Sequence, residues 1–404
     1  MQFPQRFSGL PEYAFPRLRA LLAGHAPGGP EVAMSIGEPR HAQPEMVARV
    51  IAAHAEDFSR YPPTDGTPEL RGAIADWIRH RFGAQVDPET EVLVLNGTRE
   101  GLFNAALALS PEQKGTERPV VLVPNPFYQA YGAGALAAGA ELVPVAATAD
   151  TGFLPDYAGL PAELLDRVSL CFICSPSNPQ GAVANEAYLR NLLALAERHD
   201  FRVLSDECYS EIYPDAAPVG LLGVARGAGA DPERALIFNS LSKRSSVPGL
   251  RCGFVAGGAR SIAAMGRLRA YGGAPVPLPL QHAATELWRD ETHVDASRAL
   301  YREKFALAEQ VLGGLAGYTA AQGGFFLWLH VGDGEAATLQ LWRDAGVRVL
   351  PGGYLGRAGA EGVNPGDEFI RVARVADPAE VARGLTAIRE VLGRAQAHGT
   401  ERVG

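Results

Sequence analysis

The chain has few cysteines, no surplus of basic residues and no long apolar run, and each shortage excludes a class of protein. Four cysteines in 404 residues cannot supply the disulfide framework of a small secreted protein. A formal net charge of −8 leaves no basic surplus to neutralise nucleic-acid phosphates. No apolar stretch reaches the roughly 20 residues that span a bilayer, and residues 1–10 lack the pattern of a signal peptide. We therefore expect a cytoplasmic protein that binds neither nucleic acid nor membrane.

Two of the cysteines, Cys171 and Cys174, form a C-x-x-C pair that invites a zinc or redox interpretation. The pair lies in an apolar run that begins at Ser169 and predicts a strand. Positions three apart on a strand point to opposite faces, so the two thiols should not meet. No second C-x-x-C completes a zinc site. We predict two buried structural thiols and no metal site.

From about residue 90, short apolar runs alternate with longer stretches of helical spacing. This alternation predicts an α/β fold with a mostly parallel, seven-stranded sheet covered by helices on both faces. The expected strands are 92–95, 120–123, 141–145, 170–174, 202–205, 235–238 and 252–256.

The two ends of the chain differ from this middle part. Residues 1–45 contain Pro/Gly-rich turns, and a Pro-rich stretch at 271–279 precedes a long helical segment, roughly 281–315, after which strand and helix patterns alternate again. We expect residues 46–275 to form a large ligand-binding domain. Residues 276–404 should form a smaller α/β domain, with residues 1–45 packing against it.

Polar and aromatic residues follow the expected strands. In an open α/β sheet, ligands bind beyond the carboxyl ends of the strands. After the first strand, Gly97, Thr98 and Arg99 open a helix, and free N–H groups with a hydroxyl make a phosphate seat. The later strands are followed by Tyr128, by Asn178, by Asp206 and Tyr209, and by Ser240 and Lys243.

This set of side chains is what a phosphorylated pyridine aldehyde, pyridoxal 5'-phosphate, would need. Lys243 would hold the cofactor as a Schiff base and later move the proton at the substrate Cα. Asp206 would keep the ring nitrogen protonated, which makes the ring an electron sink. Asn178 and Tyr209 would hydrogen-bond the ring hydroxyl, and Tyr128 would stack on the ring.

Arg251 precedes its apolar run instead of following it. If the strand 252–256 ran parallel to the others, the guanidinium would lie at the opposite edge of the sheet. An antiparallel strand would return it to the cofactor edge, where it could pair with the phosphate. We predict one antiparallel strand among parallel neighbours.

Each residue taken alone has a simpler interpretation. Thr98 could belong to a helix cap, Asn178 before Pro179 could be a turn residue, and Lys243 could be a solvated surface lysine. The joint position of all these residues beyond strand ends favours the cofactor.

The segment from Ser240 to Lys243, with Arg251 and Gly253 after it, resembles the lysine motif of the class I/II aminotransferases of pyridoxal-phosphate fold type I. The resemblance spans essentially the whole chain. It implies that Ser240 and Arg251 hold the phosphate together with the turn at Gly97, Thr98 and Arg99. It also implies a homodimer in which Tyr61 reaches the partner's phosphate, and a substrate site in which Arg371 clamps the α-carboxylate beside Asn178 while Gly37 closes over the substrate.

Five longer segments, among them residues 35–40, 124–131 and 205–213, are similar to bacterial succinyldiaminopimelate aminotransferases. That resemblance implies transfer of an amino group from L-glutamate to N-succinyl-2-amino-6-ketopimelate in lysine and diaminopimelate biosynthesis. A substrate with several carboxylates requires a second cationic group, for which Arg40 and Arg244 are candidates, although either could be structural. Aspartate, aromatic or alanine aminotransferase and β-lyase activities stay open on the same scaffold.

Three other functions fit the sequence less well. Ser240-x-x-Lys243 is also the S-x-x-K signature of serine acyl hydrolases, but neither S-D-N nor K-T-G follows it. A nucleotide-binding dehydrogenase would need G-x-G-x-x-G, and Gly132-Ala-Gly134 lacks that spacing. A cofactor-bearing regulator would need a basic DNA-binding domain, which the chain lacks.

Overall fold

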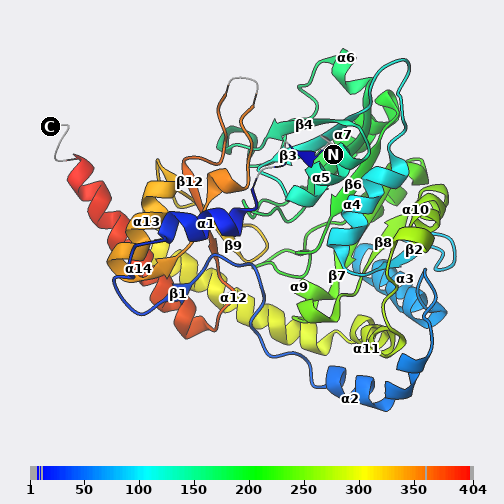
Figure 1. Cartoon of the computed structure of the whole chain (residues 1–404), viewed down its shortest axis with the longest axis horizontal. Coiled ribbons are helices and arrows are strands. Elements are labelled where there is room, and N and C mark those ends of the chain that lie inside the picture. Colours follow the sequence, from blue (N-terminus) through cyan, green and yellow to red (C-terminus); the bar gives the residue numbers. More distant parts are fainter. Residues whose placement is uncertain (1–6, 9, 11, 360–361, 401–404) are drawn as a thin grey trace, which may run out of the picture.

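The computed structural model describes residues 7–8, 10, 12–359 and 362–400 (Figure 1). Its main sheet has seven strands in the order β2-β8-β7-β6-β5-β3-β4. All seven strands expected from the sequence are confirmed, with small shifts at their ends. They are β2 (Val92–Leu95), β3 (Val120–Asn125), β4 (Glu141–Ala146), β5 (Val168–Cys174), β6 (Arg202–Asp206), β7 (Ala235–Ser240) and β8 (Gly253–Gly257).

Strand β8 is the antiparallel strand that the position of Arg251 predicted. It pairs antiparallel with both β2 and β7, whereas β3, β4, β5, β6 and β7 pair in parallel with one another. Gly253, at the start of β8, lies opposite Leu95 and Ser240, at the ends of β2 and β7. Arg251 therefore lies at the same edge of the sheet as the carboxyl ends of the parallel strands.

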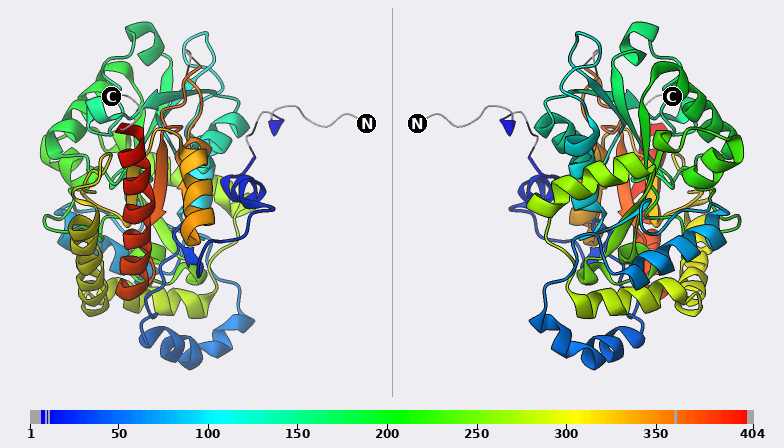
Figure 2. Two further views of the ribbon diagram at one scale, coloured as in Figure 1. Left: turned by 90° about the vertical axis from the view of Figure 1, so that its left-hand side faces the viewer. Right: turned by 90° about the vertical axis from the view of Figure 1, so that its right-hand side faces the viewer.

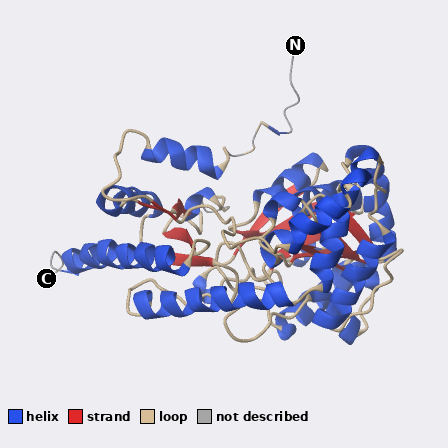
Figure 3. Cartoon of the chain, turned by 90° about the horizontal axis from the view of Figure 1, so that it is seen from below, coloured by secondary structure: helices blue, strands red, loops and turns tan. Residues whose placement is uncertain are grey.

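Helices cover both faces of this sheet, as Figure 3 shows, and two separate apolar clusters form beneath them. Alternate residues of one strand enter different clusters: Val92 and Val94 face one side, and Leu93 and Leu95 face the other. Burial on both faces explains why these strands are continuously apolar in sequence. The first cluster is covered by α3 (Pro68–Phe82), α7 (Glu186–His199), α8 (Leu221–Ala228) and α11 (Leu278–Arg289), and the second by α4 (Thr98–Leu109), α5 (Gln129–Ala137) and α10 (Ala259–Gly272).

A smaller set of β elements lies beside the main sheet (Figure 1). A three-stranded antiparallel sheet has the order β11-β12-β9, and β1, near the N-terminus, pairs in parallel with β10. These strands are β1 (Val32–Ala33), β9 (Phe326–His330), β10 (Val347–Arg348), β11 (Leu350–Pro351) and β12 (Phe369–Ala373). The helices around them are α1 (Ala14–Leu22), α12 (Thr292–Leu312), α13 (Gly334–Ala345) and α14 (Pro378–Thr400). The shorter elements are α6 (Ala162–Leu165), α9 (Leu241–Arg244), η3 (Ala149–Thr151), η4 (Pro232–Arg234), η5 (Pro248–Leu250) and η6 (Gly352–Tyr354).

The long helical segment expected at 281–315 is formed by two helices, α11 and α12. The backbone is extended at Asp290, between α11 and α12. The Asp290 carboxylate accepts a hydrogen bond from the backbone N–H of His293 at 3.0 Å, which caps the start of the second helix. Helix α11 packs against α3 and α2 (Met46–Ala53), whereas α12 packs against α14. The proposed division at 46–275 and 276–404 stays a prediction.

The four cysteines are free and buried. Cys171 lies in the core cluster beneath α7, and Cys174 lies in a different cluster with Tyr209 and Phe325. The expectation that the two thiols are buried and separate is confirmed. In the described part of the chain, no helix is long and apolar enough to cross a membrane. The cytoplasmic location stays a prediction.

One group of metal-ligand residue types occurs in the described residues, at His54, Asp57 and His282. The two imidazole rings are stacked, with centroids 3.9 Å apart and an interplanar angle of 18°. Nitrogen lone pairs lie in the ring planes, so those of two stacked rings do not converge on one ion. Asp57 also pairs with Arg60.

Candidate active site

A cavity of about 500 Å³ opens at the carboxyl edge of the main sheet, within the usual size range of small-molecule sites. It brings together side chains that are far apart in the sequence, as the sequence predicted. Two of the predicted site residues, Gly97 and Tyr61, do not line it. The predicted residues that do are Gly37, Thr98, Arg99, Tyr128, Asn178, Asp206, Tyr209, Ser240, Lys243, Arg251 and Arg371.

Lys243 reaches the cavity from the short helix α9, which follows β7 directly. Its Nζ donates a hydrogen bond to the carbonyl of Gly37 and lies 5.3 Å from the centroid of the Phe325 ring. Burial lowers the pKa of Lys243 to about 8, and the charges of Arg371 and Arg251 also lower it. Burial is the largest of these causes. Near pH 8 a large share of this amine is neutral and able to act as nucleophile or base.

Asp206 ends β6 and is only 6% exposed. Its Oδ2 accepts a hydrogen bond from the Tyr131 hydroxyl at 2.7 Å, and its Oδ1 accepts one from the backbone N–H of Cys208 at 3.3 Å. Burial raises the pKa of Asp206, and these hydrogen bonds and the charge of Lys243 oppose that rise. The carboxylate is thus fixed in orientation, and no cation among the described residues bonds to it, an arrangement that suits a protonated ring nitrogen.

Tyr131 is a functional residue that the sequence reasoning missed. It lies on α5, three residues after the predicted stacking residue Tyr128, and is fully buried with its ring stacked on Phe172 at 4.7 Å. A second tyrosine soon after Tyr128 could have been noticed in the sequence. Its hydrogen-bond partner, Asp206, comes 75 residues after Tyr131, so its role could not. Tyr131 positions the carboxylate.

The turn before α4 and the start of β8 form an anion seat. Gly97 has a φ of 83°, and a Cβ added there would lie 2.2 Å from Nη2 of Arg251. The positive φ favours glycine at this position, and a larger residue would also displace the Arg251 guanidinium. Arg251 itself has a φ of 55° and donates to the carbonyl of Pro248 at 3.0 Å. A helix N-terminus beside a guanidinium suits a phosphate.

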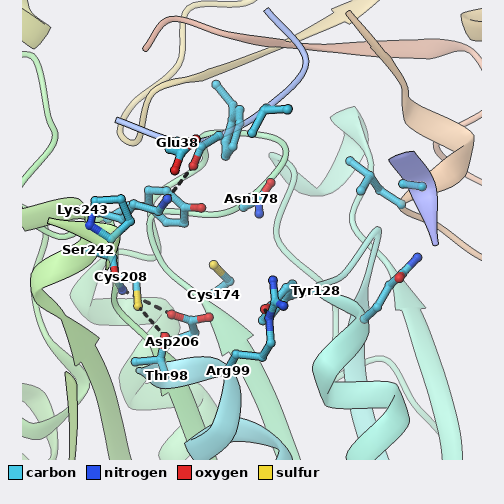
Figure 4. A pocket seen from close by; sticks show the side chains of 18 of the residues that line it. Glu38, Thr98, Arg99, Tyr128, Cys174, Asn178, Asp206, Cys208, Ser242 and Lys243 are labelled. Atoms are coloured by element: carbon cyan, nitrogen blue, oxygen red, sulfur yellow. Dashed lines mark hydrogen bonds between the residues drawn. The ribbon is translucent and has the colours of Figure 1, made fainter. Parts of the chain in front are cut away.

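Two hydroxyl groups near this seat already have partners within the protein. Ser240 caps α9, since its Oγ accepts a hydrogen bond from the backbone N–H of Ser242 at 3.1 Å. The Thr98 hydroxyl lies 3.2 Å from the Cys208 sulfur, in the direction of Asp206 (Figure 4). Ser242, which was not singled out from the sequence, also lines the cavity.

Arg371, on β12, is 5% exposed and faces the cavity. Its Nη1 donates to Oδ1 of Asn178 at 3.0 Å, and its Nη2 donates to the carbonyl of Ser35 at 2.8 Å. Its guanidinium lies 4.2 Å from the centroid of the Phe326 ring. Burial lowers the pKa of Arg371 to about 10, so the group stays charged at neutral pH. No carboxylate of the described chain neutralises it, which suits a bound anion.

The two arginines expected as candidates for a second substrate carboxylate do not line the cavity. Arg244 is buried, bonds to Glu291 and the carbonyl of Leu287, and lies 4.9 Å from the centroid of the Trp288 ring. Arg40 is exposed and pairs with Glu380 at 3.3 Å. Arg244 is held in the core and Arg40 lies at the surface, so neither is positioned to bind substrate in the cavity.

Tyr61 lies outside the cavity and is fully exposed. It follows α2 and η2 (Ala55–Ser59), which lie at the lower edge of the molecule in both views of Figure 2. Its expected contact with a partner's phosphate stays a prediction.

The model of "Aminotransferase class I and II" matches residues 30–388. The chain belongs to the class I and II aminotransferases. It is 33% identical over 402 residues to the LL-diaminopimelate aminotransferase of Desulforudis audaxviator, across 96% of this chain and 98% of that protein. It is also 33% identical to the 4-dedimethylamino-4-oxo-anhydrotetracycline transaminase of Streptomyces rimosus, across 92% and 97%.

Solved structures agree with this assignment. The crystal structure of an aminotransferase from Neisseria meningitidis matches with a TM-score of 0.91 at 36% identity, covering 96% of this chain and 100% of that one. The expected fold and the expected class of enzyme are thereby confirmed. These matches do not support the serine acyl hydrolase alternative.

Pyridoxal 5'-phosphate is the cofactor of this family, and the residues of the cavity fit it. The anion seat at Gly97 and Arg251 would hold the phosphate, Asp206 would face the ring nitrogen, and Lys243 would form the covalent bond to the aldehyde. The assignment of each residue to its contact is a prediction from this geometry.

The lowered pKa of Lys243 predicts how apoprotein captures the cofactor. Only the neutral amine attacks the aldehyde, so the capture rate should rise about tenfold per pH unit below pH 8 and level off above it. Stopped-flow mixing of apoprotein with pyridoxal phosphate at several pH values measures this profile. A Lys304→Met variant is the matched control, because Lys304 is a buried lysine outside the cavity whose pKa is also lowered to about 8. A midpoint above pH 10 would contradict the assignment.

Proposed function

We propose that the chain transfers the amino group of L-glutamate to an elongated keto acid of the diaminopimelate class. N-succinyl-2-amino-6-ketopimelate is the acceptor that the sequence resemblance implies. The observation that carries the proposal is that Lys243 and Arg371, which pairs with no carboxylate of the described residues, line one cavity. The LL-diaminopimelate aminotransferase of similar sequence supports the substrate class. An equally similar relative that acts on a tetracycline intermediate keeps the substrate a proposal.

The chain's own residues carry most of the chemistry. Bound pyridoxal phosphate supplies an aldehyde and a ring that withdraws electrons from the substrate Cα. Arg371, held by Asn178 and Ser35, fixes the substrate α-carboxylate and so directs the Cα–H bond toward Lys243. Lys243, once free and neutral, takes the proton from Cα.

Two further groups prepare the site for this proton transfer. The segment that contains Ser35 and Gly37 covers the site. The carbonyl of Gly37 accepts a hydrogen bond from Lys243, and the carbonyl of Ser35 accepts one from Arg371. Asp206, oriented by Tyr131, keeps the ring nitrogen protonated during the transfer. We also propose that the enzyme is a homodimer in which Tyr61 contacts the partner's phosphate, since its fully exposed ring is free to do so.

Half-reactions with single amino donors test the substrate. L-glutamate and N-succinyl-LL-diaminopimelate should each discharge the visible absorbance of the bound cofactor, and the matching keto acid should restore it. LL-diaminopimelate is the second candidate, favoured by the relative of that name. A faster reaction with it than with the succinylated form would assign the chain to that activity. Discharge by aspartate or aromatic amino acids alone would refute the diaminopimelate class.

A further inference from the structure

One polar side chain lies in the core behind the active site and has no part in the mechanism above. Asn239, on β7, is 0% exposed and does not line the cavity. It comes two residues after Ile237, so it shares the face of the sheet on which Ile237 enters the first apolar cluster. A buried amide on an apolar face costs free energy unless hydrogen bonds satisfy it, so its partners indicate what it does.

The Asn239 amide joins two segments that carry site residues. Its Nδ2 donates to the carbonyl of Glu207 and to the hydroxyl of Ser210, both at 3.0 Å. Its Oδ1 accepts a hydrogen bond from the backbone N–H of Ser240 at 2.7 Å. Because a carbonyl only accepts and a backbone N–H only donates, these contacts fix which way the amide points. No other side chain of the described chain hydrogen-bonds to both segments.

The amide acts where backbone pairing between β6 and β7 ends. The last paired residues are Asp206 and Phe238, and the N–H of Glu207 still donates to the Phe238 carbonyl at 2.9 Å. Beyond that point the chain turns, and the N–H of Ser210 donates back to the Glu207 carbonyl at 3.0 Å. Asn239 therefore ties this turn to β7 by a side chain, after the backbone bonds between the two strands have stopped.

The same amide is connected to Lys243 by a short series of bonds. Asn239 holds the N–H of Ser240, and the Oγ of Ser240 caps α9, the helix of four residues that carries Lys243. Asp206 lies at the other end of the series, directly before the turn that Asn239 holds. A shift of either segment would change the distance between the carboxylate and the amine.

We propose that Asn239 is a positioning residue that holds Asp206 and Lys243 at the separation that one cofactor ring requires. The inference rests on the roles that the proposed function gives to those two residues. One rigid heterocycle has to meet the carboxylate at its ring nitrogen and the amine at its aldehyde, so an error in their separation misplaces the reacting atoms. Asn239 touches neither the cofactor's place nor the substrate's, and acts only through the two segments.

Two variants test the proposal by kinetics. Asn239→Ala removes all three bonds and should lower kcat about 10- to 100-fold, the cost of a small misplacement of reacting groups. Ser210→Ala removes one bond and should lower kcat about 2- to 10-fold, in line with one neutral hydrogen bond. The KM for L-glutamate should change little in both, because Arg371 still holds the α-carboxylate.

Ser169→Ala is the matched control for Ser210→Ala. Ser169 is an equally buried serine whose hydroxyl donates to the Val120 carbonyl at 3.2 Å, near the start of β5 and outside the cavity. The control removes a hydroxyl of the same size from the core, so it should leave kcat unchanged.

Two further measurements separate positioning from a loss of stability. The apoprotein needs no substrate to capture pyridoxal phosphate, and looser packing of α9 would admit water to the Lys243 amine, whose pKa of about 8 is due mainly to burial. The midpoint of the capture profile should therefore move above pH 8 in Asn239→Ala and stay in place in Ser169→Ala. In an Asp206→Asn background the loss caused by Ser210→Ala should be smaller, because the charge to be positioned is already gone.

An equal loss from Ser210→Ala with and without the Asp206 charge would overturn the proposal, since Asn239 would not act through Asp206. A lower melting temperature with an unmoved capture midpoint and an unchanged kcat would leave Asn239 a structural role only. If Asn239→Ala does not fold, Ser210→Ala decides by the same criteria. A failure of the proposed function would appear instead in the unaltered enzyme, as no half-reaction with a donor of the diaminopimelate class.

Discussion

A Lys243→Ala enzyme is expected to lose about 10⁴-fold in turnover and all of the visible absorbance of the bound cofactor. The turnover falls because no other lysine among the described residues lines the cavity, so the proton at the substrate Cα has no base. The absorbance is lost because the covalent bond to the cofactor needs the Lys243 amine. Steady-state rates with L-glutamate and a keto acid, and a spectrum of the protein mixed with pyridoxal phosphate, measure the two effects.

The stability of the variant separates this result from unfolding. Removing a buried amine whose pKa is lowered by desolvation removes an unfavourable group, so the melting temperature should not fall by much. The Lys304→Met variant again serves as control, since it removes a lysine with no exposed surface that lies outside the cavity. A Lys243→Ala enzyme that kept both its rate and its absorbance would refute the assignment of the lysine.

The sheet could be predicted from the sequence because its strands are covered on both faces. Each strand then appears as a short continuous apolar run, and its polar neighbours fall at the carboxyl edge. The direction of β8 could also be predicted, because only an antiparallel strand brings Arg251 to that edge. The convergence of Lys243, Asp206 and Arg251 followed from these two steps, whereas Arg371, which lies outside the main sheet, was expected only from the family resemblance.

What could not be predicted depends on contacts between distant residues or on the direction of a side chain. Tyr131 acquires its role from Asp206, and nothing near it in the sequence shows that partner. Arg99 follows the phosphate turn in sequence, yet its side chain leaves the turn for Tyr128. Arg244 is adjacent to Lys243, but the helix turns it into the core against Trp288 and Glu291. Neighbours in sequence point to different surroundings, so sequence position alone does not distinguish site residues from structural ones.

Replacing Asp206 with asparagine should lower kcat about 10²- to 10³-fold, the usual cost of removing one preorganised electrostatic partner. The substitution keeps the size of the side chain and an oxygen that can accept the Tyr131 hydrogen bond, but it removes the negative charge. The ring nitrogen then loses the group that keeps it protonated, and the ring withdraws electrons from the substrate Cα less strongly. Steady-state kinetics should show a fall in kcat with a small change in KM, because Arg371 still holds the α-carboxylate.

The spectrum and a second variant distinguish this effect from loss of the cofactor. Lys243 is intact in Asp206→Asn, so the protein should still bind pyridoxal phosphate covalently, in contrast to Lys243→Ala. Tyr131→Phe removes only the hydrogen bond that orients the carboxylate and leaves its charge, so kcat should fall about tenfold, in line with one hydrogen bond to a charged group. If Asp206→Asn retained the kcat of the unaltered enzyme, the carboxylate would not act on the ring nitrogen, and its burial beneath the cavity would need a structural explanation. A larger loss in Tyr131→Phe than in Asp206→Asn would contradict the order of these roles, because a residue that acts by positioning a charge cannot matter more than the charge.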